Sequence, residues 1–268
     1  MILAIDAGNT HTIIGCVNEK TNQVVQTMQM CTSTQGTAYE YAVTMKQIME
    51  LAGVDPRGFD GAIIASVVPQ INLVLSKAVR LITGCRPMVL GAGIRTGLNI
   101  RLDDPGTIAG DLVATAVAAK EEYPLPAIIV DMGTATTITI VDQGGRYLGG
   151  CIMPGVGISM DALARETALL PSIDYSAPRK VIGTNTIDCM RSGIVFGSAG
   201  AIDGVIDRYE KELGTVGSIV ATGGMGRLIA PYCSHKIIID NRLLLKGLGY
   251  IYNKNLETKV SRSSSHKS

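Results

Sequence analysis

The sequence predicts an α/β protein of two related lobes that face a shared cleft. An aspartate-glycine-threonine signature occurs twice, at Asp6–Ile13 and at Asp131–Ile138. Each copy lies between two short apolar runs rich in β-branched residues, a pattern typical of strand, tight polar turn and strand. Around both copies, apolar runs alternate with segments of helical periodicity, which favours helices layered on sheets.

Composition narrows the functional class. The chain has 268 residues, 46% of them hydrophobic, which is enough for one large domain or two of ordinary size. Its net charge is +1, with no tryptophan and two phenylalanines, so we expect no nucleic-acid partner.

No apolar run approaches the roughly 20 residues that span a bilayer, and the chain opens with a strand rather than a leader, so we expect a cytoplasmic protein without a membrane partner. The six cysteines contain no C-x-x-C pair and are expected to be buried, reduced thiols.

Each element of the first lobe follows from a local pattern. Proline at position 69 stops a buried strand, and apolar residues at helical spacing mark the helices. The predicted elements are strands at 2–5, 13–17 and 24–30, a helix at 39–51, a strand at 61–68, a helix at 70–84 and a strand at 87–90.

A helix from Gly110 to about Tyr123 leads into the second lobe. The chain is broken there by Pro124-Leu125-Pro126, and we place the boundary near this helix. The predicted domains are residues 1–118 and 119–255, followed by a polar tail at 256–268. Further elements are strands at 127–130 and 138–141, a turn and strand at 144–150, helices at 159–169 and 187–213, a strand at 219–222 and a helix at 242–252.

The two turns have the chemistry of a phosphate site. Glycine, asparagine and threonine after a strand offer amide and hydroxyl donors to phosphate oxygens, and glycine permits close approach. An aspartate beside them would hold a cation, directly or through water, as Mg²⁺ prefers. Two such turns could clamp a triphosphate and its cation from both sides. The alternative for either copy alone is an ordinary hairpin turn. Thr222-Gly223-Gly224 could bring backbone close to adenine or ribose, although many strand-to-helix turns look the same.

Asp111 stands at the start of an apolar helix. It could be an N-cap or first-turn residue favoured by the helix dipole. It could instead be a general base that takes a proton from a hydroxyl attacking the γ-phosphate. No G-x-x-x-x-G-K-[ST] occurs, which excludes a P-loop.

These residues resemble the type III pantothenate kinases, within the superfamily of acetate and sugar kinases, heat-shock proteins and actin. The resemblance covers about residues 1–255. It is carried by Asp6-x-Gly8-Asn9-Thr10, Ala65-Ser66-Val67-Val68-Pro69, Asp131-x-Gly133-Thr134, Pro154-Gly155 through Pro171, Asn185-Thr186 with Ser192-Gly193, and Thr222-Gly223-Gly224.

The resemblance implies two ribonuclease-H-like domains of mixed sheet flanked by helices, with a cleft between them. It implies ATP-dependent phosphorylation of the primary hydroxyl of pantothenate to 4'-phosphopantothenate, the first step of coenzyme A biosynthesis, in a homodimer. Asp111 would accept the proton. Asp131 would bind a monovalent cation, K⁺ or NH₄⁺, and Asp6 would hold Mg²⁺ through water. ATP would meet Asp6, Ala7, Gly8, Asn9, Thr10, His11, Thr12, Ile13, Thr134, Gly223 and Gly224, and pantothenate would meet Leu102, Ala109, Gly110, Asp111, Leu112 and Thr186.

Two positions depart from the family's pattern. Leu112 stands where the family has the arginine expected to meet the pantothenate carboxylate, and Leu102 stands where it has a tyrosine. Losing a charge-assisted contact costs on the order of 1.5–3 kcal/mol. Two alternatives therefore stay open: a kinase for another small hydroxylated substrate, or a nucleotide-binding accessory protein. Arginines that could compensate are Arg101, Arg165 and Arg191.

Overall fold

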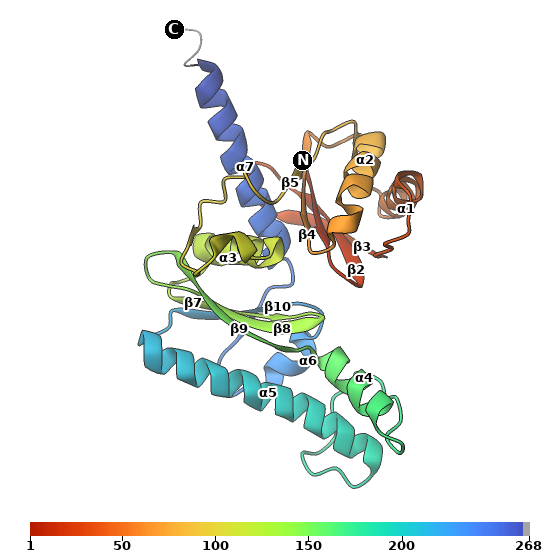
Figure 1. Cartoon of the computed structure of the whole chain (residues 1–268), viewed down its shortest axis with the longest axis vertical. Helices are drawn as coiled ribbons and strands as arrows, with labels where there is room; N and C mark the ends of the chain where they lie inside the picture. Colours follow the sequence, from red (N-terminus) through yellow and green to blue (C-terminus); the bar gives the residue numbers. More distant parts are fainter. Residues whose placement is uncertain (265–268) are drawn as a thin grey trace. The chain divides into compact units, whose positions relative to one another are not determined.

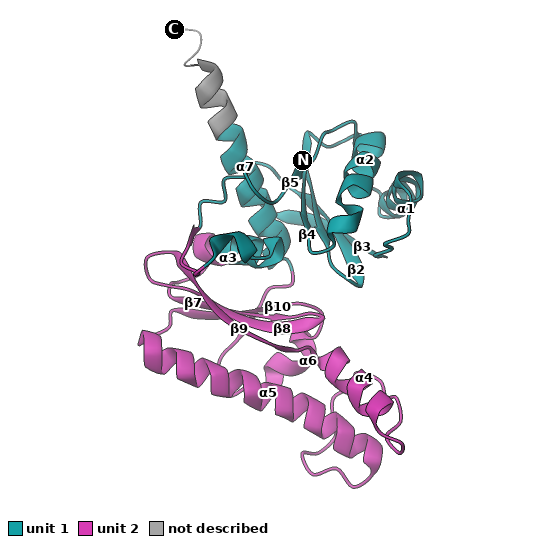
Figure 2. Ribbon diagram, viewed as in Figure 1, with its two compact units in different colours: residues 1–98, 104–118, 242–268 teal, residues 99–103, 119–241 magenta. Residues whose placement is uncertain are grey.

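The computed structural model describes residues 1–264 and, within them, the side chains of residues 1–257. The chain forms two compact units (Figure 2). Unit 1 comprises residues 1–98, 104–118 and the described chain from 242 onward, and unit 2 comprises residues 99–103 and 119–241.

Unit 1 is built on a five-stranded mixed sheet in the order β3-β2-β1-β4-β5. Strands β1, β2 and β3 are antiparallel neighbours, whereas β4 runs parallel to β1 and β5 parallel to β4. The strands are β1 (Ile2–Ala7), β2 (His11–Val17), β3 (Val24–Cys31), β4 (Gly61–Ser66) and β5 (Met88–Val89).

Helices cover both faces of this sheet. Helices α1 (Ala38–Leu51) and α2 (Asn72–Thr83) bury one face in an apolar core, with the 3-10 turn η1 (Pro69–Ile71) leading into α2. Helix α7 (Leu243–Ser264) lies against the other face (Figure 1). There the strands carry glycine: a Cβ on Gly15 would lie 2.7 Å from Leu245 Cδ1, and one on Gly61 would lie 1.7 Å from the Tyr252 hydroxyl. The missing side chains let α7 approach closely.

Unit 2 repeats this topology strand by strand. Its sheet has the order β11-β10-β7-β8-β9-β6, and the run β9-β8-β7-β10-β11 matches β3-β2-β1-β4-β5 in order and direction. The extra strand β6 pairs parallel to β9 at one edge. The strands are β6 (Asn99–Ile100), β7 (Ala127–Met132), β8 (Ala135–Val141), β9 (Arg146–Pro154), β10 (Ser218–Thr222) and β11 (Ile238–Ile239).

The helices of unit 2 pack on one sheet face around a second apolar core. They are α4 (Val156–Glu166), α5 (Thr186–Leu213) and the short α6 (Gly226–Ile229), which continues into η3 (Ala230–Tyr232). Helix α3 (Gly110–Glu122), preceded by η2 (Pro105–Thr107), carries the chain from unit 1 into unit 2. Residues 113–119 of α3 are buried on every side.

The prediction of an α/β protein with two related mixed sheets flanked by helices is confirmed. Several element predictions were inaccurate, and strand β6 was not among the predicted strands. Helix α4 begins at Val156 rather than 159, because Gly155 is its N-cap. Helix α7 continues to Ser264 rather than ending at 252, so much of the predicted polar tail is helical, and residues 265–268 lie outside the described chain. Strand β11 was missed, because two exposed isoleucines carry little strand signal.

The units are bounded differently from the predicted domains in two places. Residues 99–103 belong to unit 2, because β6 pairs with β9. Residues 242–255 belong to unit 1, because α7 packs on its sheet. The cysteines are all free, but only Cys16 is buried as expected, while Cys31 and Cys189 are exposed and the other three are half-buried. No helix among the described residues is long and apolar enough to span a bilayer.

Candidate functional site

The first turn joins β1 to β2 and closes through a backbone hydrogen bond. The amide of Gly8 donates to the carbonyl of His11 at 3.0 Å, which leaves Asn9 and Thr10 exposed at the tip. Asp6 is half-buried one residue before the end of β1. The Thr32 hydroxyl, in the residue that follows β3, donates to the Gly8 carbonyl at 2.8 Å and fixes the turn.

The remaining residues of the predicted ATP loop support this turn from below. Ala7 and Thr12 face each other across the hairpin and are fully buried, and Ile13 is half-buried opposite Asp6. Among the side chains of this loop, those of Asn9, Thr10 and His11 are exposed and that of Asp6 is half-buried, so polar contact with a ligand or its cation falls to these four and to the backbone.

The second turn, between β7 and β8, repeats the arrangement with one residue fewer. Asp131 is half-buried and pairs with Thr137, while the amide of Gly133 donates to the carbonyl of Ala135 at 3.0 Å and Thr134 is exposed. Ala7 pairs with Thr12 in the first hairpin, but Met132 pairs with Thr136 in the second. Thr12 therefore corresponds in space to Thr136, not to Thr137 as the sequence alignment of the two copies suggests.

A glycine turn after β10 lies directly against this second turn. Thr222 pairs with Asp131, and the amide of Met225 donates to the carbonyl of Met132 at 3.1 Å. Gly223 has a φ of +88°, and a Cβ there would lie 2.6 Å from the Met132 carbonyl oxygen and 2.7 Å from Asp131 Oδ1. Only glycine fits this backbone conformation and this gap. Gly224 is different, since a Cβ there would meet nothing within 4 Å.

The residue that precedes α4 also packs against the turn between β7 and β8. A Cβ on Gly155 would lie 2.2 Å from the Thr134 carbonyl oxygen. Unit 2 thus brings together three motifs that are distant in sequence: the hairpin turn with Asp131 and Thr134, the start of α4 at Gly155, and the glycine turn at Gly223.

Asp111 lies in the first turn of α3, half-buried. Burial raises the pKa of its carboxyl, although the Leu112 amide, 2.7 Å from Oδ1, opposes that rise. A raised pKa makes the carboxylate a better proton acceptor near neutral pH. The sequence offered two interpretations of Asp111, a residue of the first helical turn or a general base. The structure places it in the first turn, and a general base can occupy that position.

The beginning of α3 packs beside the first hairpin. A Cβ on Gly110 would lie 3.8 Å from the Cβ of Ala65, and Ala65 is the register partner of Asp6 on the neighbouring parallel strand. Paired residues of parallel strands project to the same face of a sheet. The side chain of Asp6 therefore projects to the sheet face against which the segment that carries Asp111 is packed.

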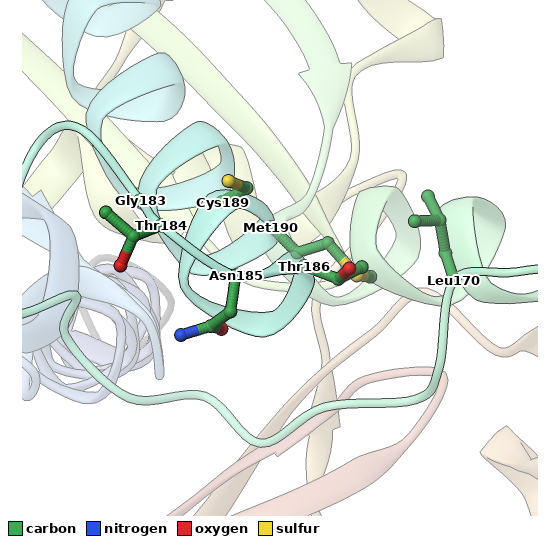
Figure 3. A pocket seen from close by; sticks show the side chains of 7 residues that line it. All are labelled: Leu170, Gly183, Thr184, Asn185, Thr186, Cys189 and Met190. Atoms are coloured by element: carbon green, nitrogen blue, oxygen red, sulfur yellow. The ribbon is translucent and has the colours of Figure 1, made fainter.

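The other predicted acceptor residues are divided between the units. Ala109 and Leu112 flank Asp111 in unit 1 and are half-buried. Leu102 is half-buried in unit 2, and a Cβ on Gly149 would lie 3.1 Å from its side chain. Thr186 is exposed at the start of α5 in unit 2, where it lines a pocket of about 630 Å³ (Figure 3). The pocket residues are Leu170, Gly183, Thr184, Asn185, Thr186, Cys189 and Met190.

The three arginines considered as replacements for the missing one lie in unit 2. Arg101 is exposed. Arg165 pairs with Glu166 at 2.9 Å, and Arg191 pairs with Asp174 and Asp188. Two of the three are therefore already engaged by carboxylates.

The residues present suit the cations that the family resemblance implies. Asp6 and Asp131 each hold a carboxylate at the end of a strand, beside an open turn of backbone amides and threonine hydroxyls. Hard cations such as Mg²⁺ and K⁺ prefer oxygen ligands, and the exposed turn leaves room for phosphate oxygens to complete the coordination.

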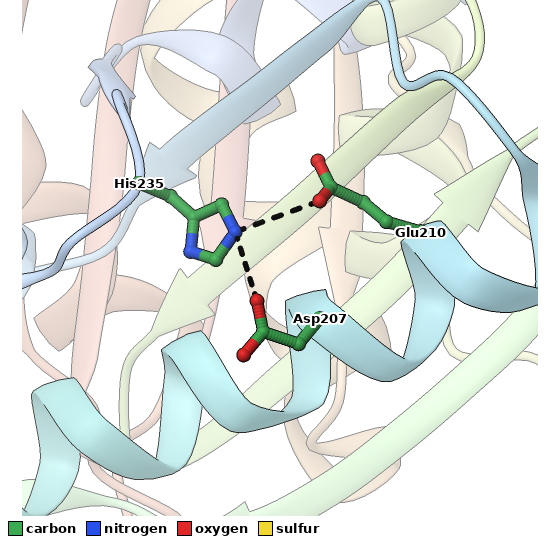
Figure 4. Close-up of side chains that lie close together, drawn as sticks. All are labelled: Asp207, Glu210 and His235. Carbon is green, nitrogen blue, oxygen red and sulfur yellow. Dashed lines mark ion pairs between the residues drawn. The ribbon is translucent and has the colours of Figure 1, made fainter.

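A further ionisable cluster, which the sequence analysis missed, surrounds His235 in unit 2 (Figure 4). Its Nδ1 lies 2.8 Å from Asp203 Oδ1, and its Nε2 lies 3.3 Å from Asp207 and 3.7 Å from Glu210. The hydrogen bond to Asp203 is the chief reason that the pKa of His235 is raised. The signal was the spacing of the three acids along α5, which places them on one helix face.

Known proteins resemble this chain over nearly its whole length. The sequence model of the type III pantothenate kinase family matches residues 2–208. A type III pantothenate kinase from Halalkalibacterium halodurans is 41% identical over 256 residues, 96% of this chain and 100% of the relative. One from Moorella thermoacetica is 38% identical over 255 residues, 95% of this chain and 100% of the relative.

A solved structure supports the fold independently. The activator of 2-hydroxyisocaproyl-CoA dehydratase from Clostridium difficile, solved with bound ADPNP, is 13% identical and has a TM-score of 0.56, covering 98% of this chain and 97% of its own. At that identity the likeness concerns the fold alone. The family match and the two close relatives settle the classification: this chain belongs to the type III pantothenate kinase family.

Proposed function

We propose that this protein transfers the γ-phosphoryl group of ATP to the primary hydroxyl of pantothenate, giving 4'-phosphopantothenate, the first step of coenzyme A biosynthesis. Family membership carries this function. The packing of the Asp111 segment on the face of the sheet that carries Asp6 is the structural observation that supports it best.

In this proposal Asp111 accepts the proton of the attacking hydroxyl. Its raised pKa suits that role, because a more basic carboxylate takes a proton more readily. The amides and hydroxyls of the two hairpin turns would bind phosphate oxygens, Asp6 would hold Mg²⁺ through water, and Asp131 would hold K⁺ or NH₄⁺. The cations would neutralise the charge that develops during transfer.

The glycine turn and α4 have supporting roles. Gly223 holds the β10 turn against Asp131, and Gly224, whose surroundings are open, offers backbone to the adenosine part of ATP. Thr186, on the rim of the unit 2 pocket, would contact pantothenate.

A homodimer is the proposed assembly. Large apolar side chains are exposed along β9, α4, the segment that follows and the first turn of α5, which is unusual for a surface that faces only water. They are Ile152, Ile158, Leu163, Leu169, Val181, Ile182 and Ile187. Light scattering of the purified protein at several concentrations would measure the assembly, and a monomer throughout would refute it.

A second candidate follows from Leu102 and Leu112, which are both apolar and half-buried. A small alcohol without a carboxylate would not need a charged partner at these positions, so the two leucines would not weaken its binding. Such an acceptor, for example an amide of pantothenate, is the alternative substrate.

One assay separates these functions. Protein is given ATP, Mg²⁺ and K⁺ with pantothenate or with a neutral amide of it, and ADP release is measured. Pantothenate-dependent release that is lost in Asp111→Asn and kept in Asp103→Asn, a change of an exposed carboxylate close by in the sequence, supports the first function. Release only with the amide supports the second, and ATP binding without turnover contradicts both. Replacing K⁺ by Na⁺ in the same assay tests the monovalent cation.

A further inference from the structure

The segment between α4 and α5, residues 167–185 and here called the strap, forms one wall of the unit 2 pocket. The strap is irregular throughout. The strap contributes Leu170, Gly183, Thr184 and Asn185 to the pocket lining, and the first turns of α5 contribute Thr186, Cys189 and Met190. The shape of the pocket therefore depends on how the strap is held against α5.

The strap ends in Asn185, the N-cap of α5, and its Ile173 packs on the second apolar core. Three further contacts join the strap to α5. Gly183 lies so close to the helix that a Cβ there would be 2.5 Å from the Cys189 amide nitrogen. The Ser192 hydroxyl donates a hydrogen bond to the Val181 carbonyl. The Arg191 guanidinium forms an ion pair with Asp174, nearer the α4 end of the strap. The first two points fix only the end next to α5, so Arg191 alone among these three reaches the middle of the strap.

Arg191 is well placed to hold two carboxylates at once. Its side chain is 25% exposed, its Nη1 lies 3.8 Å from Asp188 on α5, and the same guanidinium pairs with Asp174 on the strap. Its Nε is buried and has no partner among the described residues. A planar guanidinium can bridge two carboxylates in fixed geometry, which a lysine cannot do equally well.

We propose that Arg191 is a positioning residue for the acceptor substrate: by bridging Asp174 and Asp188 it fixes the strap, and thereby the strap residues that line the pocket together with Thr186. This inference rests on the proposed function, in which Thr186 contacts the acceptor. Arg191 acts through the strap and is not available as the carboxylate anchor itself, because Asp174 and Asp188 already engage it.

The test compares Arg191→Gln with Arg179→Gln, which removes the same charge from an exposed site on the strap itself. Removing the bridge should raise KM for the acceptor about 5-fold, the upper range for a single partly exposed ion pair, with kcat and KM for ATP unchanged. Arg179→Gln should leave all three constants at their wild-type values. Arg191→Lys should recover part of the loss, because it keeps a charge near Asp174.

A second measurement does not depend on activity. Hydrogen exchange of residues 172–184 should become faster in Arg191→Gln and stay as in the wild type in Arg179→Gln. Unchanged exchange and unchanged acceptor KM in Arg191→Gln would overturn the inference. A fall in kcat equal to the change in kcat/KM would also overturn it, since positioning through the pocket wall predicts a KM effect. If the wild type has no acceptor-dependent activity, the proposed function fails, while the exchange data still decide whether Arg191 holds the strap.

Discussion

Replacing Gly223 by alanine tests how closely the glycine turn packs against the second hairpin. A side chain at a φ of +88° costs about 1–2 kcal/mol, because L-residues disfavour that region. The new methyl group would also lie 2.6 Å from the Met132 carbonyl oxygen and 2.7 Å from Asp131 Oδ1, so backbone must move. Overpacking of this kind costs about 1–3 kcal/mol. Together the change should lower the free energy of unfolding by about 2–5 kcal/mol.

Gly224→Ala is the matched control. The neighbouring glycine has open space around it and its φ lies outside the left-handed range, so the same substitution should change stability by less than about 0.5 kcal/mol. Thermal unfolding followed by circular dichroism should show Tm about 5–15 °C lower for Gly223→Ala than for Gly224→Ala. Equal Tm values for the two variants would refute the close packing described here. Since Gly223 touches Asp131, its variant should also show a higher KM for ATP at a temperature where it is still folded.

Three further predictions concern other parts of the chain. Asp111→Asn should lower kcat about 100- to 10,000-fold with ATP affinity retained, as expected for the loss of a general base, and normal turnover in this variant would exclude that role. The pKa of His235 is raised on folding, so its contribution to stability is fully present below pH 6.5, its ordinary pKa, and is lost as pH rises through the folded value. The difference in Tm between wild type and His235→Gln should therefore shrink from pH 6 to pH 8.5, and a pH-independent difference would contradict this. Asp142→Ala should lower the free energy of unfolding by about 2–3 kcal/mol. The reason is that Asp142 accepts hydrogen bonds from the amides of Gly144 and Arg146 and pairs with the Arg146 side chain. Chemical denaturation measures this free energy, and Asp103→Ala, at an exposed position, is the comparison.

The features predicted best from the sequence are those that depend on residues close together in the chain. The two hairpins, the long α5 and the glycine turn after β10 each combine periodicity with turn-forming residues within a short window, and all of them lie where expected. The duplication of the hairpin was also visible in the sequence. The structure confirms it, because Asp6 and Asp131 occupy the same half-buried position in strands with the same burial pattern.

Features that depend on contacts between distant segments could not be read in the same way. Nothing local in residues 242–252 indicates that this helix packs on the first sheet, because the glycines that admit it are at positions 15 and 61. The one-residue difference between the two turns became visible only through strand register. The acids around His235 share a helix face, but the histidine reaches them from a separate segment.

The return of α7 to unit 1 has a consequence for biosynthesis. A ribosome releases residues 1–118 long before Leu245 and Tyr252, which fill the grooves left open by Gly15 and Gly61. The part of the first sheet that α7 covers is therefore exposed while the whole of unit 2 is translated. Nascent chains paused before residue 242 should be sensitive to protease in unit 1 and should need chaperone protection until the last helix emerges.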